Sequence, residues 1–269
     1  MRVQSLGFRT DLALRRLGGS SIVSRDGYIV VQSPRNPDFW WGNFVLLPEP
    51  IGPGHGERLH QIFREEFPDA AHLAIGIDGT HGVVGDSAEV ESLGLTVHVD
   101  AVLTAERLRR PPRAAGDAVF RRLEDDDDWD QAVSLRLAVY DDLNLPDQRR
   151  FTERRLQESQ EICVRGAGAW FGAFLEGRLV SALGLVRADA GLARYQAVET
   201  VAEHRGKGLA SRLLYESSVY GNEVFGARTL VIAADPDYHA VDIYRSLGFA
   251  VAERQVQLEL PRRDVPAQS

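Results

Sequence analysis

The amino-acid sequence predicts an α/β protein of the α+β type, built as two units. Two observations predict this class. Short β-rich runs alternate with longer segments of helical periodicity along most of the chain. A stretch rich in proline, glycine and alanine at residues 111–116 follows a basic segment and is the best candidate for a linker. We therefore expect two domains, at residues 1–112 and 117–262.

The first domain is expected to contain short strands and one amphipathic helix. Strands are predicted at residues 20–23, 28–32, 73–78 and 95–103. Residues 44–47 form a further apolar run. The pattern at residues 57–67 places Leu59, Ile62 and Phe63 on one side of a helix, which should face the core.

The second domain is expected to follow the order β-α-α-β-β-β-α-β-α-β. Strands are predicted at residues 119–123, 170–175, 178–186, 195–201, 229–234 and 251–260, and helices after the acidic run 124–128, at 147–164, from 209 and up to 248. The acidic run suits the start of a helix, because carboxylates are stabilised by the positive end of the helix dipole.

The most informative stretch is residues 198–214, where a β-rich run leads through a basic glycine turn into a helical pattern. Arg205, Gly206, Lys207 and Gly208 form the turn. Glycines let backbone N–H groups approach a ligand closely, and the new helix adds unpaired N–H groups and the positive end of its dipole. This arrangement predicts a binding site for phosphate oxygens.

The turn matches neither of two common phosphate motifs. It lacks the Gly-Lys-Ser/Thr ending of the P-loop, and Ser211 stands where the dinucleotide fingerprint has its third glycine. It fits Arg-x-x-Gly-x-Ala, from Arg205 to Ala210, and the chain later reads Tyr-x-x-Leu-Gly-Phe, from Tyr244 to Phe249. These two motifs, in this order and with a strand between them, resemble the GNAT N-acetyltransferase superfamily.

The resemblance covers about residues 118–260. It implies a GNAT fold, with a central mixed and mostly antiparallel sheet flanked by helices. It also implies an acetyl-CoA-dependent N-acetyltransferase, in which a primary amine attacks the thioester directly in a ternary complex. The residues that would bind acetyl-CoA are Thr200, Val201, Arg205, Gly206, Lys207, Gly208, Leu209, Ala210 and Ser211.

The resemblance implies two catalytic residues. Glu199, on the strand before the turn, would take a proton from the amine, which is protonated at neutral pH. Tyr244 would supply a hydrogen bond to the leaving thiolate, a transfer that is uphill by about 2 kcal/mol for an ordinary phenol. The alternatives are a solvent-facing or salt-bridged Glu199 on a strand and a Tyr244 that serves only the core.

Acceptor recognition is expected from the loop at residues 141–147. Asp141 and Asp142 would attract a cationic amine, although a solvated loop explains them equally well. Asp237 stands where many family members carry an asparagine, so a contact to the pantetheine arm is in doubt there. Small polyamines, aminoglycosides, amino acids and protein N-termini all remain open as acceptors.

A weak internal repeat suggests that the first domain is a degenerate GNAT-like half. Residues 73–78 match residues 230–235, and residues 92–95 match residues 246–249, in the same order and at nearly the same separation. The turn at residues 51–57 contains Pro53, which lacks an N–H donor, and Val90 matches Tyr244. We expect a structural or substrate-shaping role there.

Composition excludes several classes of function. A formal net charge of −8 argues against broad binding to nucleic acids or anionic membranes, and the seven histidines have no spacing that indicates a metal site. No apolar run reaches the length of a membrane span, and no secretory signal is recognised. Cys163 is the single cysteine, so no intrachain disulfide can form, which agrees with a cytoplasmic protein.

Two alternatives to an acetyltransferase remain open. A non-catalytic CoA-binding or sensor module would keep residues 205–210 without using Glu199 or Tyr244. A transferase of a longer acyl group would use the same residues. The oligomeric state is left open.

Overall fold

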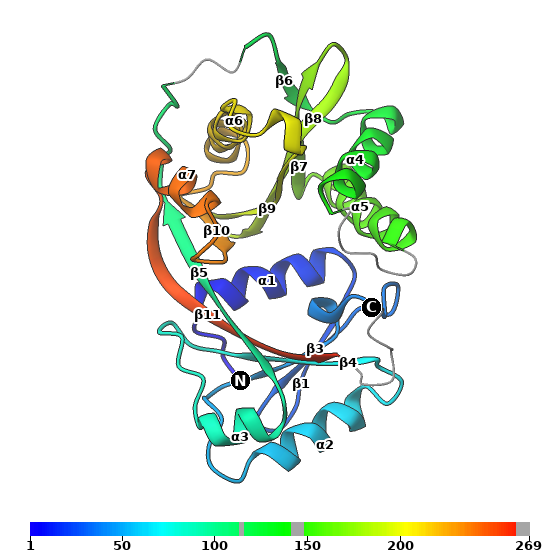
Figure 1. The fold of residues 1–269 in the computed structure, drawn as a ribbon, viewed down its shortest axis with the longest axis vertical. Coiled ribbons are helices and arrows are strands. Elements are labelled where there is room, and N and C mark those ends of the chain that lie inside the picture. The colour runs from blue at the N-terminus through cyan, green and yellow to red at the C-terminus, as the bar shows by residue number, and fades with distance from the viewer. Residues whose placement is uncertain (113–115, 141–147, 262–269) are drawn as a thin grey trace. The chain divides into compact units, whose positions relative to one another are not determined.

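The computed structural model describes residues 1–112, 116–140 and 148–261 (Figure 1). The chain forms two compact units: unit 1 is Met1–Val102 with Ala252–Ser269, and unit 2 is Leu103–Val251. The division therefore falls before the stretch that we took as the linker. The last strand, expected in the second domain, gives most of its residues to unit 1. The assignment of the two halves to an inactive and a catalytic domain stays a prediction.

Unit 1 contains a sheet with helices packed against it. Its helices are α1 (Leu6–Leu17), α2 (Gly56–Glu66) and α3 (Ser87–Ser92), with a 3-10 turn at Trp40–Gly42; its strands are β1 (Ser21–Ser24), β2 (Ile29–Gln32), β3 (Phe44–Leu47) and β4 (His72–Ile77). The strand order is β1-β2-β3-β4, and then β11 (Ala250–Pro261). Only β3 and β4 run parallel in this series.

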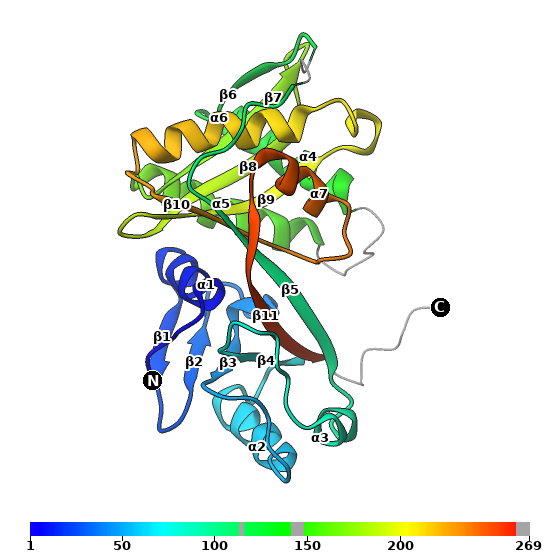
Figure 2. The same ribbon diagram turned by 90° about the vertical axis from the view of Figure 1, so that its left-hand side faces the viewer.

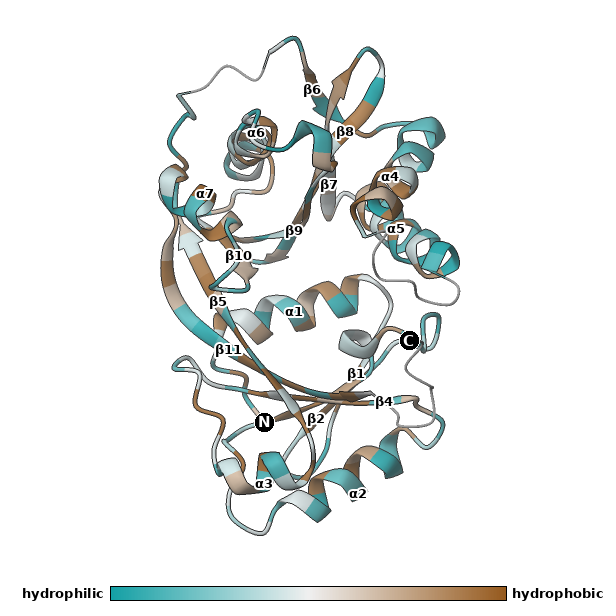
Figure 3. Ribbon diagram, in the orientation of Figure 1, coloured by the Kyte–Doolittle hydropathy of each residue, from teal (hydrophilic) through white to brown (hydrophobic). Residues whose placement is uncertain are grey.

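The core of unit 1 is made by these strands and by one side of its helices. Val31, Leu46 and Ala74 of the sheet and Phe8 of α1 are fully buried. Leu59 and Phe63 of α2 are buried as well, as their spacing predicts. Figure 3 shows the result in hydropathy, because strands β2 and β4 are largely hydrophobic while α2 carries many hydrophilic residues. Burial of these side chains supplies the main free energy that holds the unit together.

Unit 2 has three layers. Its helices are α4 (Asp126–Val139), α5 (Gln148–Val164), α6 (Leu209–Glu223) and α7 (Ala240–Leu247), with a 3-10 turn at Ala202–His204; its strands are β6 (Val119–Arg122), β7 (Gly168–Leu175), β8 (Arg178–Asp189), β9 (Leu192–Thr200) and β10 (Thr229–Ala234). The strand order is β5 (Thr96–Ala105), and then β10-β9-β8-β7-β6. Helices α4 and α5 cover one face of strands β7–β9 and α6 covers the other (Figure 2).

This arrangement confirms the predicted fold class. The sheet of unit 2 is mixed and mostly antiparallel, since only β9 and β10 among its paired strands run parallel. The predicted order of helices and strands over residues 119–260 is also observed. No helix in the described parts of the chain is long and apolar enough to cross a membrane.

The two units repeat one series of elements. Along the chain the series is first β3, α2, β4, α3 and β5, and later β9, α6, β10, α7 and β11, although most of β11 belongs to unit 1. Helices α3 and α7 also end alike. Gly94 and Gly248 both have positive φ, and the N–H of the next residue donates to the carbonyl of Val90 in one case and Tyr244 in the other. This shared ending supports the repeat seen in the sequence.

Candidate active site

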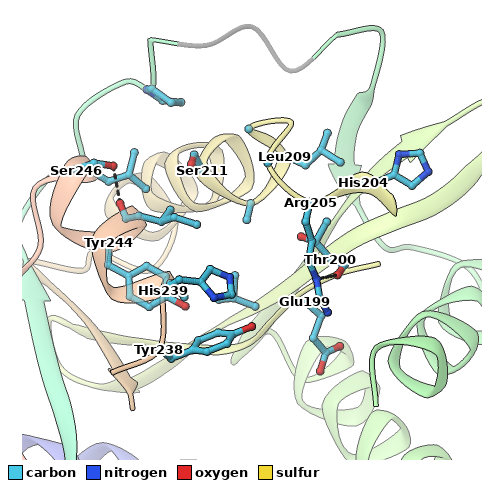
Figure 4. A pocket seen from close by; sticks show the side chains of 18 of the residues that line it. Glu199, Thr200, His204, Arg205, Leu209, Ser211, Tyr238, His239, Tyr244 and Ser246 are labelled. Atoms are coloured by element: carbon cyan, nitrogen blue, oxygen red, sulfur yellow. Dashed lines mark hydrogen bonds between the residues drawn. The ribbon is translucent and has the colours of Figure 1, made fainter. Parts of the chain in front are cut away.

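A cavity of about 640 Å³ opens in unit 2 around the turn before α6 (Figure 4). Its lining includes three groups of residues: Val198–Thr200 at the end of β9, the turn and first residues of α6, and the residues from Tyr238 to Leu247. In Figure 4, Tyr238, His239 and Tyr244 lie on one side of the cavity, and Glu199, Thr200 and Arg205 lie on the other. Glu199, Tyr244 and most of the residues predicted to bind acetyl-CoA therefore line one cavity.

The turn presents backbone donors to this cavity. Gly206 has φ of 74°, and Gly208, the N-cap of α6, has φ of 82°, a conformation that glycine adopts without strain. Helix α6 has no side-chain cap and no acidic residue in its first turn. The first N–H groups of the helix are thus left for a ligand, and the helix dipole favours a negative one. This geometry fits a pyrophosphate.

Seven of the nine residues predicted to bind acetyl-CoA line the cavity: Thr200, Arg205, Gly206, Gly208, Leu209, Ala210 and Ser211. The Nε of Arg205 donates to the carbonyl of Thr200 at 3.1 Å, which fixes the guanidinium beside the turn. Val201 and Lys207 lie outside the lining. Val201 borders a second cavity, and the Nζ of Lys207 lies 3.3 Å from the Nδ1 of His204.

Strands β9 and β10 separate where they reach the cavity. They pair only between residues 192–194 of β9 and Thr229–Val231 of β10, although β9 continues to Thr200. The rest of β9 bonds to β8 through a bulge, since β9 has one extra residue between the partners of Ala182 and Gly184. Ala197 in this bulge has φ of 51°, which is unusual for alanine. The β10-facing edge of β9 is left open to a ligand.

Glu199 lies on β9 beside this bulge and is only 6% exposed. Its Oε1 accepts a hydrogen bond from the Nε of Arg136 on α4 at 2.9 Å. Burial raises the pKa of Glu199, and the charge of Arg136 and the phenol of Tyr140 partly offset this rise. The salt-bridged arrangement named as an alternative is therefore present, on a carboxylate that also borders the cavity.

Tyr244 lies on α7 and is 5% exposed, with its ring edge-on to Phe249. Within the described residues its hydroxyl has no hydrogen-bond partner, in contrast to the buried Tyr195, whose hydroxyl donates to the carbonyl of Leu214 at 2.9 Å. Burial raises the pKa of Tyr244, and the nearby phenols of Tyr238 and Tyr140 contribute to the rise. The group is therefore a neutral donor next to the cavity.

The cavity residues that the sequence did not indicate include Tyr140, Tyr238, His239 and Ile243. Tyr140 is 42% exposed and Tyr238 is 49% exposed. The signal for Tyr238 and His239 was their place directly before the helix that carries Tyr244.

Asp237 and Cys163 contribute no group to the cavity. Asp141 and Asp142 lie outside the described residues. Asp237 does not line the cavity, and its N–H bonds to the carboxylate of Asp235 at 2.9 Å. Burial raises the pKa of the Cys163 thiol to about 12, so this residue is not an activated nucleophile. No group of three or more potential metal ligands is found in the part of the chain that the structure describes.

Comparison with known proteins identifies the domain. Residues 136–249 match the model of the Acetyltransferase (GNAT) family, a range that contains the cavity residues from Val139 onward. A search of curated proteins found no match.

Solved structures share the fold at low sequence identity. A functionally unknown protein from Staphylococcus epidermidis has a TM-score of 0.69 at 12% identity, over 90% of this chain and 94% of that one. A GCN5-related N-acetyltransferase from Kribbella flavida has a TM-score of 0.65 at 17% identity, over 96% and 97% of the two chains. A tandem GNAT protein from the clavulanic acid biosynthesis pathway has a TM-score of 0.53 at 16% identity, over 76% and 68%. By the family model, residues 136–249 therefore form a domain of the GNAT family, and the solved structures show the fold that this chain shares.

Proposed function

We propose that this protein is an N-acetyltransferase that moves the acetyl group of acetyl-CoA to a primary amine by direct attack. One observation carries the proposal. One cavity joins an uncapped helix N-terminus with a glycine turn to a buried carboxylate and a phenol whose hydroxyl has no hydrogen-bond partner among the described residues. The first pair suits the pyrophosphate, and the second pair suits the proton transfers of amide formation.

The binding roles follow from the geometry. The N–H groups at the start of α6 and the guanidinium of Arg205 would hold the pyrophosphate oxygens. The open edge of β9 offers backbone groups to the amides of the pantetheine arm. The thioester would then lie between Glu199 on β9 and Tyr244 on α7, which border opposite sides of the cavity (Figure 4).

The nitrogen must lose two protons, and the sulfur must gain one. Glu199, directly or through a water, takes the first proton from the ammonium, and the free amine nitrogen then bonds to the thioester carbonyl carbon. The carbon–sulfur bond breaks, and the sulfur leaves as a thiolate with a hydrogen bond from Tyr244. The nitrogen gives its second proton to solvent, and the thiolate takes up a proton from Tyr244 or from solvent. The products are the acetylated amine and CoA. Burial makes Tyr244 a weaker acid than an ordinary tyrosine, so its main effect is to stabilise the developing charge on sulfur.

The acceptor is proposed only as a class. We propose a primary amine of a small molecule or peptide, attracted in part by Asp141 and Asp142. The cavity walls near Glu199 include the rings of Tyr140 and Tyr238, which can contact both an ammonium group and an apolar chain. We also propose a cytoplasmic location, because the single Cys163 allows no intrachain disulfide.

Release of free thiol from acetyl-CoA, measured with and without a panel of amines, tests the proposal. We expect release that depends on one class of amine. Binding of CoA without amine-dependent release would support a sensor module instead. Faster release from a longer acyl-CoA would assign the same site to a different acyl donor.

A further inference from the structure

Arg136 and Glu199 form an ion pair beside the cavity. Arg136 lies near the end of α4, 63 residues before Glu199 in the chain, and the two side chains are 16% and 6% exposed. The contact joins Nε and Oε1 at 2.9 Å. Glu199 lines the cavity and Arg136 does not, so the arginine contacts the carboxylate without occupying the cavity wall.

We propose that Arg136 is a positioning residue that keeps Glu199 ionised and directs its free acceptor sites toward the bound amine. The inference rests on the proposed role of Glu199 as the base. A carboxylate has about four acceptor sites; Arg136 and the phenol of Tyr140 use some of them, and the others are left for a ligand. A base must be ionised to accept a proton, and burial alone would favour its neutral form.

The surroundings of Glu199 support this role. The titratable groups that act on it are Arg136 and Tyr140, both at the end of α4, and Tyr238 acts in turn on Tyr140. Arg136 is the cation of this set. Burial and Arg136 change the pKa of Glu199 in opposite directions, so removal of the arginine charge leaves burial unopposed.

Helix α4 offers a matched control. Arg121 on β6 binds Asp128 on α4 with two hydrogen bonds, one of them 2.7 Å between Nη2 and Oδ1, and the Asp128 side chain is 2% exposed. This pair is also an arginine with a buried carboxylate, but neither member lines the cavity. Loss of the Arg121–Asp128 pair should lower the free energy of unfolding without changing the protonation of Glu199.

The experiment compares kcat/KM against pH for Arg136→Gln, Arg121→Gln and Glu199→Gln with the same amine. We expect Arg136→Gln to lose at least about tenfold more activity at pH 6 than at pH 9, because its Glu199 stays protonated to higher pH. Arg121→Gln should change kcat/KM by the same factor at every pH. Arg136→Lys, which keeps the charge, should restore most of the wild-type profile. A profile of Arg136→Gln parallel to that of Arg121→Gln would overturn the proposal.

A stability measurement separates this inference from the proposed function. Chemical unfolding of Arg136→Gln should show a loss that grows with pH and disappears when Glu199→Gln is added, since no buried charge then remains. If Glu199→Gln keeps wild-type activity, the base assignment fails whatever the unfolding shows. If Arg136→Gln unfolds with the same loss at every pH, Arg136 does not hold Glu199 ionised.

Discussion

The carboxylate of Glu89 accepts a hydrogen bond from the backbone N–H of Gly56, with 2.9 Å between Oε2 and N. Its other oxygen accepts from the N–H of Gly54 at 2.6 Å. These donors lie at the start of α2, which holds the place in unit 1 that α6 holds in unit 2. An internal carboxylate thus occupies the donors that would otherwise bind a phosphate.

We expect unit 1 to bind no CoA in the intact protein, and none when this carboxylate is altered, because the turn at residues 51–57 also contains Pro53, which lacks an N–H donor. Glu89→Gln should lower the free energy of unfolding by about 1–2 kcal/mol, since a charged group leaves a helix N-terminus. Calorimetry should still find one CoA per chain. Glu91→Gln, on the same helix and exposed, serves as the control and should change neither quantity. A second CoA bound to the Glu89 variant would contradict this explanation.

His72 predicts a pH dependence of stability. Its ring is 6% exposed, stacks on Trp40 and bonds through Nε2 to the carbonyl of Asn43 at 2.9 Å; burial lowers its pKa. The unfolded chain therefore binds a proton that the folded one resists, so stability should fall as the pH drops below about 6.5, by at most about 1.4 kcal/mol per pH unit.

Urea unfolding of the wild type and His72→Gln between pH 5 and pH 8 checks this prediction. The variant should be less stable throughout but should lose less stability on acidification. Equal slopes for the two proteins would show that His72 does not cause the dependence.

Gly208→Val should abolish binding of acetyl-CoA. A β-branched residue is strained at φ of 82°, and its side chain would occupy the space next to the first N–H groups of α6. Gly177→Val is a matched control, because Gly177 has φ of 79° in the turn between β7 and β8 and a Cβ there meets no atom within 4 Å. Calorimetry should show lost affinity only for Gly208→Val. Equal affinity in the two variants would remove the turn from the binding site.

Tyr244→Phe should slow turnover by roughly 10²–10⁴-fold with little change in affinity for acetyl-CoA. The phenol acts as charge develops on sulfur, and this loss corresponds to about 3–5 kcal/mol of barrier. Stability should hardly change, since within the described residues the hydroxyl has no hydrogen bond to lose. A thermal melt beside the kinetics distinguishes a catalytic phenol from a core tyrosine. Near-normal turnover would leave solvent as the source of the proton.

Local patterns were sufficient to predict most of the fold. The apolar run at residues 229–234 is β10, and the helix predicted at residues 147–164 is α5, which is described over Gln148–Val164. Helix α1 was missed, although Ser5 precedes it and its hydroxyl accepts from the N–H of Phe8, which is a typical N-cap. Apolar spacing and caps are local properties, so they are readable without knowledge of the partners.

The pairing of the last strand could not be predicted in this way. Residues from Val256 to Pro261 of β11 pair with β4, almost 180 residues earlier, and belong to unit 1. An alternating strand pattern records which faces are buried, but it does not record which strand lies beside it.

The candidate site was predictable in its motifs but not in its electrostatics. The glycine turn and the ending after Tyr244 are short patterns with a physical meaning. The contact of Arg136 with Glu199 depends on how α4 lies against β9, and the positive φ of Ala197 has no local cause in the sequence. Such features arise from tertiary packing, so the structure was needed to find them.

The most direct test of acetyl transfer is to incubate the intact protein with isotopically labelled acetyl-CoA and a panel of amines, and to detect the products by mass. The account predicts a labelled amide from one class of primary amine, with one free CoA for each amide formed. The same product should be lost with Gly208→Val and kept with Gly177→Val. Bound CoA with no labelled amide above the rate without protein, for every amine tested, would contradict it.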